Sequence, residues 1–116
     1  MDYLFILNDS PYGSERTFNA ARLAESLIRQ EGTGVRLFLM GDAAVAGHGG
    51  QKVPKGYYNL QQMLSIVVRH GGEIGVCGTC MDARGIEEGE LFEGAHRSTM
   101  DELTQWTTTA DRILVF

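Results

Sequence analysis

The sequence predicts a single α/β domain over residues 1–116, with a mostly parallel sheet of about four to five strands and helices on both faces. Two observations support this prediction. Short apolar runs alternate with stretches of helical periodicity along the chain, and such alternation is typical of parallel sheets covered by helices. A chain of 116 residues, 43% of them hydrophobic, suits one domain with its own core. The pattern therefore indicates a three-layer arrangement of flavodoxin or Rossmann type.

Four segments are predicted to be strands, because each is a short apolar run. They are residues 2–9, 35–42, 73–78 and 112–116. Three further segments carry apolar residues at the spacing of one helix face. Their apolar stripes are Ala20, Leu23, Ala24, Leu27 and Ile28; Leu60, Met63, Leu64, Val67 and Val68; and Met100, Leu103, Thr107 and Ala110, with Trp106 beside the last stripe.

Cap and turn signals mark the boundaries of these segments. Ser14 is expected to cap the first helix, and the second is expected to begin near Asn59. Glycines follow both helices and are expected to end them. Short helical turns are expected at residues 43–46 and 79–86, whereas residues 87–98 are predicted to be a loop with room for one helical turn.

Composition and charge argue against two kinds of partner. Ten basic and fifteen acidic residues give a net charge of −5, and phosphate binding relies on clustered Lys and Arg, so direct contact with nucleic acid is not expected. No apolar run approaches the ~18 residues that span a bilayer, and no basic segment precedes an apolar stretch at the start. We therefore expect a cytoplasmic protein with no membrane partner.

The pair Cys77-x-x-Cys80, within GVCGTCMDARG, is the most informative feature of the sequence. In parallel sheets, ligands and catalytic groups lie beyond the carboxyl ends of the strands. Residues 8–14, 41–56 and 77–85 are all expected at that edge. In a reducing compartment, a close cysteine pair is more often catalytic or metal-binding than structural. The pair therefore becomes the candidate site.

Three interpretations of the cysteine pair are a metal site, a thioredoxin-like redox site and ordinary packing. A zinc site usually needs a second ligand pair, and His48, His70 and His96 provide none, so no metal or other cofactor is expected. A thioredoxin-like site follows an early strand and faces a proline loop, whereas the only prolines here are Pro11 and Pro54. Disulfide chemistry on a different fold stays open. Ordinary packing is also open, since cysteines are small and usually buried.

A single nucleophilic thiol is the fourth interpretation. Cys77 would end a strand where a helix begins, so it would meet backbone N–H groups and the positive end of the helix dipole. The N–H groups of Gly78 to Cys80 and the hydroxyl of Thr79 could donate hydrogen bonds, and Arg84 could add positive charge. Such surroundings favour a thiolate. They would also stabilise a persulfide, whose terminal sulfur is an anion.

Other residues are candidates for the border of the site. Asn8 and Tyr12 follow the first predicted strand and could line a pocket beside the thiol, although Asn also favours turns for local reasons. His48 lies in the glycine-rich loop 47–56 and could act as a gate or an acid/base group, or simply be solvated. The loop's length and its glycines favour a mobile flap. It lacks the phosphate-binding glycine motifs, so nucleotide binding is not predicted.

Five stretches spread along essentially the whole chain carry a family likeness. They are LFILNDSPYGSERTFNAARLA, VRLFLMGDAA, GHGGQKVPKGYYNLQQML, GVCGTCMDARGI and RILVF. Together they resemble the DsrE-like family (DsrE/DsrF-like, YchN-type). The resemblance implies a compact α/β fold assembled into a homo-oligomer, either a trimer or a hexamer.

The same resemblance implies a role in sulfur relay. The best-understood members of the family are cytoplasmic sulfur carriers, which accept sulfane sulfur as a cysteine persulfide from a donor protein and pass it to an acceptor protein. Cys77 matches the acceptor position at the end of a strand, with Gly85 eight residues beyond it. Cys80 does not match that position. The GTC sequence and Asp82 depart from the small apolar residues that usually follow the acceptor.

Three functional hypotheses follow. The first is a sulfur carrier or sulfurtransferase component in which Cys77 bears the persulfide and Cys80 is either a resolving thiol or a neighbour with no chemical step. The second is a thiol–disulfide redox protein in which both cysteines cycle. The third is a non-catalytic oligomeric binding module in which the pair is incidental.

Overall fold

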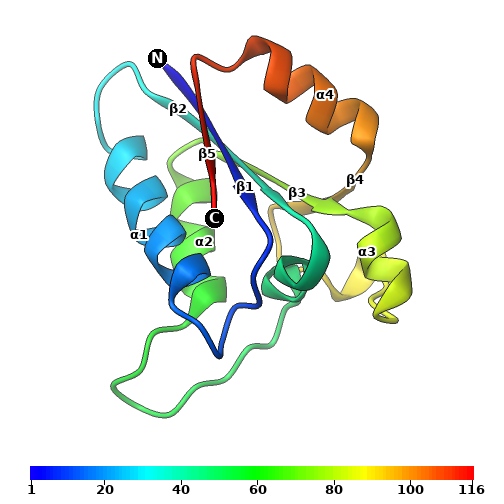
Figure 1. Cartoon of the computed structure of the whole chain (residues 1–116). Coiled ribbons are helices and arrows are strands. Elements are labelled where there is room, and N and C mark those ends of the chain that lie inside the picture. Colours follow the sequence, from blue (N-terminus) through cyan, green and yellow to red (C-terminus); the bar gives the residue numbers. More distant parts are fainter.

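The fold is one five-stranded parallel sheet with helices on both faces, as the sequence predicts (Figure 1). The structure is a computed structural model that describes residues 1–116. The strands are β1 (Asp2–Leu7), β2 (Gly34–Leu39), β3 (Glu73–Cys77), β4 (Ala95–Ser98) and β5 (Arg112–Val115). They lie in the order β4-β3-β2-β1-β5, and every neighbouring pair is parallel. All five carboxyl ends therefore meet at one edge.

The helices follow the predicted order along the chain. They are α1 (Arg16–Ile28), the 3-10 helix η1 (Gly41–Gly47), α2 (Leu60–Arg69), α3 (Gly78–Ala83), the 3-10 turn η2 (Glu88–Glu90) and α4 (Met100–Thr109). None of them is both long enough and apolar enough to cross a membrane.

Each face of the sheet has its own apolar cluster. On one face, α1 and α2 pack against alternate strand residues such as Phe5 and Leu37 in the larger cluster. On the other face, α4 contributes Leu103 and Trp106 to a smaller cluster that also contains Leu4, Phe38 and Cys77. Cys77 is therefore the last residue of β3 on the face that α4 covers.

β4 is the one strand that the sequence does not reveal. The sequence predicts a loop over residues 87–98, but Ala95–Ser98 pair with Ile74–Cys77 of β3. The sequence of this strand is AHRS, which contains no apolar run, and only Ser98 is buried. β4 is an edge strand with a single neighbour, so its residues do not need the apolar character that marks the inner strands.

The helix starts agree with the cap signals in one case and differ in another. Asn59 caps α2, and its side-chain oxygen accepts a hydrogen bond from the Gln62 N–H at 3.1 Å. The expected cap at Ser14 is wrong, because α1 begins at Arg16 with Glu15 in the N-cap position. The Ser14 hydroxyl still accepts the Arg16 N–H at 3.4 Å from one residue before the N-cap position, and it donates to Asp9 at 3.0 Å.

The glycine-rich loop between η1 and α2 makes a long excursion from the body of the domain (Figure 1). Gln51 ties its first part down. The side-chain amide of Gln51 donates to the carbonyl oxygens of Ala46 and His48, both at 2.9 Å, and its side-chain oxygen accepts from the Tyr12 hydroxyl at 2.7 Å. The residues that follow, 52–57, are mostly exposed.

Candidate functional site

The three segments that the sequence places at the carboxyl edge of the sheet lie there, and two of them meet at the cysteines. β3 ends at Cys77 and α3 starts at once, while β2 is followed by Gly41 and η1. The Gly41 N–H donates to the sulfur of Cys80 at 3.2 Å, so the two segments meet at the cysteines. Asn8, after β1, is one step further away: its carbonyl oxygen lies 3.5 Å from where a Cβ of Gly41 would be.

The two cysteines lie side by side at this edge. The structure pairs Cys77 with Cys80 as a disulfide, with their Cα atoms 5.2 Å apart. Cys77 is 9% exposed, and Cys80 is half-buried. The two sulfur atoms are therefore in direct contact. They lie at the boundary between the core and the solvent.

Each sulfur atom has its own hydrogen-bond donors. The sulfur of Cys77 accepts the backbone N–H of Cys80 at 3.3 Å and contacts the Thr79 hydroxyl at 3.4 Å. The sulfur of Cys80 accepts the N–H of Gly41, whose φ of +56° is a left-handed conformation suited to glycine. Hydrogen bonds from such donors stabilise a thiolate sulfur.

The donors differ in part from those that the sequence suggests. Among the N–H groups from Gly78 to Cys80, the one that reaches the Cys77 sulfur is that of Cys80, together with the Thr79 hydroxyl. α3 is only six residues long, and Cys77 is its N-cap residue. Gly78 has a different part, because it makes room for an arginine.

That arginine is Arg97 of β4, which sequence reasoning missed. Its guanidinium lies against Gly78 and makes two hydrogen bonds to Asp82 of α3, at 2.9 and 3.0 Å. The hydrogen bond from Arg97 holds the pKa of Asp82 below its ordinary value, and the Asp82 carboxylate in turn raises the pKa of Arg97. Because β4 itself is invisible in the sequence pattern, no sequence signal placed Arg97 beside the cysteines.

Arg84 joins α3 to η1 on the other side of the pair. Its guanidinium donates to the Cys80 carbonyl oxygen at 3.1 Å and to the Asp42 carboxylate at 2.8 Å. The positive charge that the sequence suggests near the thiols is therefore present, but much of it is balanced by Asp42. The role of Arg84 in chemistry stays a prediction.

A polar cluster on β4 and α4 adjoins Cys77. Ser98 is the strand partner of Cys77 in the parallel register, and its buried hydroxyl donates to Glu102 at 2.6 Å. His96 also contacts the carboxylate of Glu102. Burial raises the pKa of Glu102, but the hydrogen bonds from Ser98 and His96 outweigh it, so the net pKa is lowered.

The remaining predicted site residues form a second group around Gln51. Tyr12 donates to the Gln51 side chain and accepts the Leu60 N–H at 3.2 Å. His48 contacts the Gly49 carbonyl oxygen at 2.6 Å and the carboxylate of Glu90 at 3.3 Å. Neither Tyr12 nor His48 makes a hydrogen bond to a cysteine, and their part in the site stays a prediction.

Asn8 lies nearest to the sheet end among the outer candidates. Its backbone N–H and its side-chain amide both donate to the Phe116 carbonyl oxygen, at 2.9 and 3.2 Å. These bonds tie the end of β1 to the end of the chain beside it. Asn8 therefore supports the carboxyl edge through the backbone, with Gly41 between it and Cys80.

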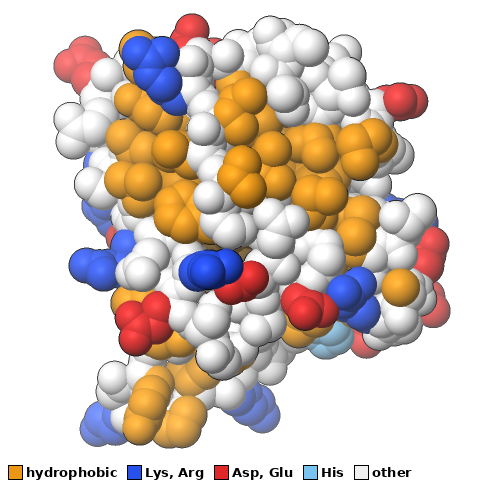
Figure 2. Space-filling view, viewed as in Figure 1, with side chains coloured by type: hydrophobic (Ala, Val, Ile, Leu, Met, Phe, Trp, Pro, Cys, Tyr) orange, Lys and Arg blue, Asp and Glu red, His pale blue; other side chains and the backbone are white.

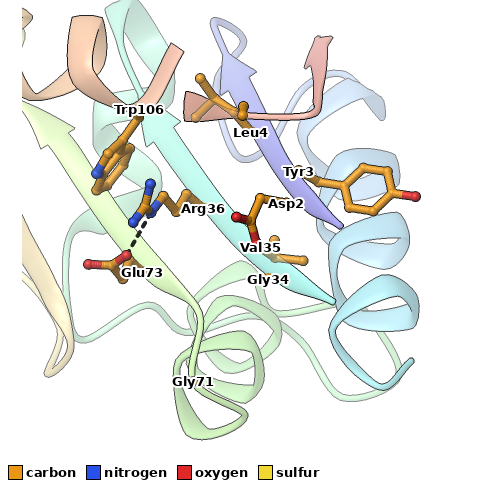
Figure 3. A pocket seen from close by; sticks show the side chains of 10 residues that line it. Asp2, Tyr3, Leu4, Gly34, Val35, Arg36, Gly71, Glu73 and Trp106 are labelled. Carbon is orange, nitrogen blue, oxygen red and sulfur yellow. Dashed lines mark hydrogen bonds and ion pairs between the residues drawn. The ribbon is translucent and has the colours of Figure 1, made fainter. Parts of the chain in front are cut away.

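A separate pocket of about 110 Å³ lies at the opposite, amino-terminal edge of the sheet (Figure 3). There Arg36 forms an ion pair with Glu73 at 2.7 Å and lies over the ring of Trp106, 5.5 Å from its centroid. The strands separate this pocket from the cysteines, which end β3 and begin α3. No three His, Cys, Asp or Glu side chains group in a way that could hold a metal ion.

The fold and the site together define an α/β thiol protein, with a cysteine pair at the carboxyl edge of a parallel sheet. The profile of the DsrE/DsrF-like family matches residues 1–116. The chain therefore belongs to the DsrE/DsrF-like family, as its motifs predict.

Individual relatives agree with this assignment. The protein YchN of Escherichia coli K12 is 46% identical over 114 residues, covering 97% of each chain. An uncharacterized protein of Methanopyrus kandleri is 33% identical over 111 residues, covering 96% of this chain and 90% of the relative. The crystal structure of E. coli YchN superposes with a TM-score of 0.94 at 45% identity, covering 100% of this chain and 99% of that one.

Proposed function

We propose that this chain is a cytoplasmic sulfur carrier that holds sulfane sulfur as a persulfide on Cys77. The observation that carries the proposal is the surroundings of the Cys77 sulfur. It is mostly buried, it accepts the Cys80 N–H, and it contacts the Thr79 hydroxyl. Burial protects a persulfide from solvent thiols, and the two donors stabilise the negative sulfur that makes the attack.

Transfer of sulfur from a donor persulfide to Cys77 balances in atoms and electrons without a cofactor. The Cys77 thiolate attacks the outer sulfur of a donor persulfide, R–S–SH, and forms the new S–S bond. The bond between the two donor sulfurs breaks, and R–S⁻ leaves with the electron pair. Cys77–S–SH then carries the sulfur, and the outer sulfur passes to the thiolate of an acceptor protein by the same exchange. Membership of a family linked to sulfur relay supports this direction of transfer.

A direct test is to incubate the protein with a persulfide donor and measure the mass of the tryptic peptide that contains both cysteines. Reduced protein is incubated with glutathione persulfide, alkylated, and digested with trypsin to give residues 70–84, which contain both cysteines. The proposal expects one extra sulfur atom on Cys77 in Cys80→Ser, and none in Cys77→Ser. If Cys80→Ser takes up no sulfur on Cys77, the carrier function is wrong.

A thiol–disulfide redox function is the second candidate, because the structure pairs the two sulfurs as a disulfide. In that case the reduced pair gives up two electrons and two protons to a partner disulfide, which becomes a dithiol. The same peptide would lose two hydrogen atoms in wild type and would carry no extra sulfur in Cys80→Ser. The experiment above therefore separates the two functions.

We also propose that the protein is a homo-oligomer, assembled through the β1–β5 side of the sheet. β5 has a neighbouring strand on one side only. Its residues Ile113 and Val115 are 43% and 66% exposed, on the face where Leu4 is covered by α4. Figure 2 shows apolar side chains gathered across this part of the molecule. A second copy of the chain would cover both the edge strand and this apolar surface.

Light scattering after size exclusion tests the assembly. Wild type is expected to elute as a trimer or a hexamer, and Val115→Lys at a lower mass, because a charge would enter the apolar contact. Tyr57→Lys is the matched control, since Tyr57 is 71% exposed on the distant loop and should leave the mass unchanged. A monomeric wild type would overturn the proposal.

A further inference from the structure

The second cysteine is in position to act on the sulfur that the first one holds. In a carrier with a single thiol, the persulfide waits for an external acceptor. Here the sulfur of Cys80 contacts the sulfur of Cys77 itself, in the disulfide pair, and a short turn of α3 links the two residues. Any persulfide on Cys77 would therefore form beside a second nucleophile in the same chain.

We propose that Cys80 releases the sulfur of the Cys77 persulfide as hydrogen sulfide, so that the chain is an internal persulfide reductase. This inference rests on the carrier function proposed above. The Cys80 thiolate attacks the inner sulfur, Sγ of Cys77, and the Cys77–Cys80 disulfide forms. The bond between the inner and outer sulfurs breaks, and the outer sulfur leaves with the electron pair and its own proton as HS⁻.

A dithiol returns the two cysteines to their reduced state after the step. The persulfide sulfur is reduced to sulfide, and the two cysteine sulfurs are together oxidised to the disulfide. A small or protein dithiol, R(SH)₂, then reduces that disulfide to the two thiols and becomes a cyclic or protein disulfide. One turnover therefore consumes one persulfide and one dithiol, and it yields one sulfide.

Geometry favours attack on the inner sulfur. Cys80 is paired with Sγ of Cys77, and that atom becomes the inner sulfur of the persulfide. The backbone N–H of Cys80 also donates to Sγ of Cys77, which holds this sulfur next to the first turn of α3. Transfer of the outer sulfur to Cys80 would require contact with a different atom, further along the persulfide.

The attacking sulfur has its own support. The N–H of Gly41 donates to the sulfur of Cys80, and this donor comes from η1, outside the turn that links the cysteines. Arg84 fixes the same contact from outside, because it bonds both the Cys80 carbonyl oxygen and Asp42 of η1. The Cys80 thiolate is thus stabilised separately from the Cys77 thiolate, as two successive nucleophiles require.

Release of sulfide also determines which classes of reaction must follow this one. A single-thiol carrier delivers sulfur only to an acceptor nucleophile that docks on it. A chain that releases HS⁻ supplies inorganic sulfide to any reaction that consumes it, and it needs a dithiol-regenerating reaction to continue. The sulfur would then leave as a small anion, and no acceptor protein would have to dock.

Single-turnover release tests the inference. Reduced wild type and Cys80→Ser are loaded with glutathione persulfide, freed of donor by gel filtration, and left without added thiol. Sulfide is trapped with monobromobimane, and residues 70–84 are weighed. Wild type is expected to release one sulfide for each persulfide lost and to show the peptide two hydrogens lighter. Cys80→Ser is expected to keep its persulfide.

The possible failures are distinguishable. If neither protein takes up sulfur, the carrier function fails. If both load and wild type keeps its persulfide as long as Cys80→Ser does, the carrier function stands and the role of Cys80 is wrong. Release of sulfide from wild type without the intramolecular disulfide would also overturn it. Cys80→Ala serves as a second variant, so that a hydrogen bond from serine cannot account for the result, and addition of dithiothreitol should make the wild-type release catalytic.

Discussion

The guanidinium of Arg97 lies against the backbone of Gly78, the residue that directly follows Cys77. A Cβ at Gly78 would come within 2.9 Å of two atoms of that guanidinium. The same group makes two hydrogen bonds to Asp82, near the end of α3. A side chain from the edge strand β4 therefore spans α3 and fixes the short helix that carries Cys80.

Replacing Gly78 with alanine should loosen the site without unfolding the domain. The new methyl group would displace the Arg97 guanidinium from α3, and the Asp82 hydrogen bonds would be lost. The guanidinium is the end of a flexible side chain, so it can move into solvent at little cost to folding. We expect a several-fold faster reaction of the reduced Cys77 thiol with iodoacetamide, because α3 no longer shields it as well.

Gly89→Ala is the matched control for this substitution. No atom lies within 4 Å of where its Cβ would be, and its backbone is not left-handed. Alkylation of this variant should follow wild type. Equal rates for Gly78→Ala, Gly89→Ala and wild type would show that Arg97 does not position α3.

The anchoring of the glycine-rich loop gives a prediction about Gln51. Its amide group donates to two carbonyl oxygens, of Ala46 and His48. In Gln51→Glu, a carboxylate oxygen would face those carbonyls with no proton to share. We expect the free energy of unfolding to fall by about 2 kcal/mol, the usual cost of leaving such groups unpaired. Urea unfolding followed by circular dichroism measures it.

An exposed glutamine supplies the comparison. Gln62 lies in the first turn of α2, where a negative charge is favourable, so Gln62→Glu should cause no loss of stability. If both variants unfold at the same urea concentration, Gln51 does not hold the loop. Tyr12→Phe should also lower the stability, because it removes one bond to Gln51 and the acceptor of the Leu60 N–H.

Most of the fold could be predicted because the inner strands are apolar. β1, β2 and β3 contribute buried residues to both clusters, so each of these strands is an apolar run in the sequence. β4 shows nothing of this kind, since its sequence AHRS is largely exposed at the sheet edge. Its position follows only from backbone pairing with β3, which leaves no periodic signal in the sequence.

Only the part of the site whose residues lie close together in the sequence was predictable. Cys77, Thr79 and Cys80 lie within four consecutive residues, and their mutual contacts follow from one turn after a strand. Gly41 and Arg97 reach the same place from β2 and β4, through sheet pairing that no nearby motif announces. Local motifs thus identified the sulfur atoms, and tertiary structure supplied most of what surrounds them.

The only tryptophan should be the main support of the α4 face. Trp106 is 5% exposed, meets Phe38 edge-on with ring centroids 6.3 Å apart, and lies under the Arg36 guanidinium (Figure 3). Trp106→Ala should lower the free energy of unfolding by about 3–5 kcal/mol, through lost burial and an unfilled cavity. Met100→Ala in the same helix is the control, since Met100 is 61% exposed and should change stability by less than about 0.5 kcal/mol. Denaturant unfolding followed by circular dichroism compares them, and equal losses would contradict this account of the face.

The carboxylate of Glu102 should make stability depend on pH. Its pKa in the folded protein is lowered from 4.5 because Ser98 and His96 bond the charged form more than burial opposes it. A group with a lowered folded pKa stabilises the protein above its unfolded pKa, and this stabilisation disappears as the pH falls through the folded value. Glu102→Gln should therefore be less stable than wild type at neutral pH, by about 1 kcal/mol for a partly exposed group, and the difference should shrink as the pH falls below 4.5.

Urea unfolding of both proteins from neutral to acidic pH measures this difference. Ser98→Ala removes the donor at 2.6 Å and should reproduce part of the effect with the same dependence on pH. A stability gap between wild type and Glu102→Gln that stays constant across the range would mean that the Glu102 charge is not held by Ser98 and His96.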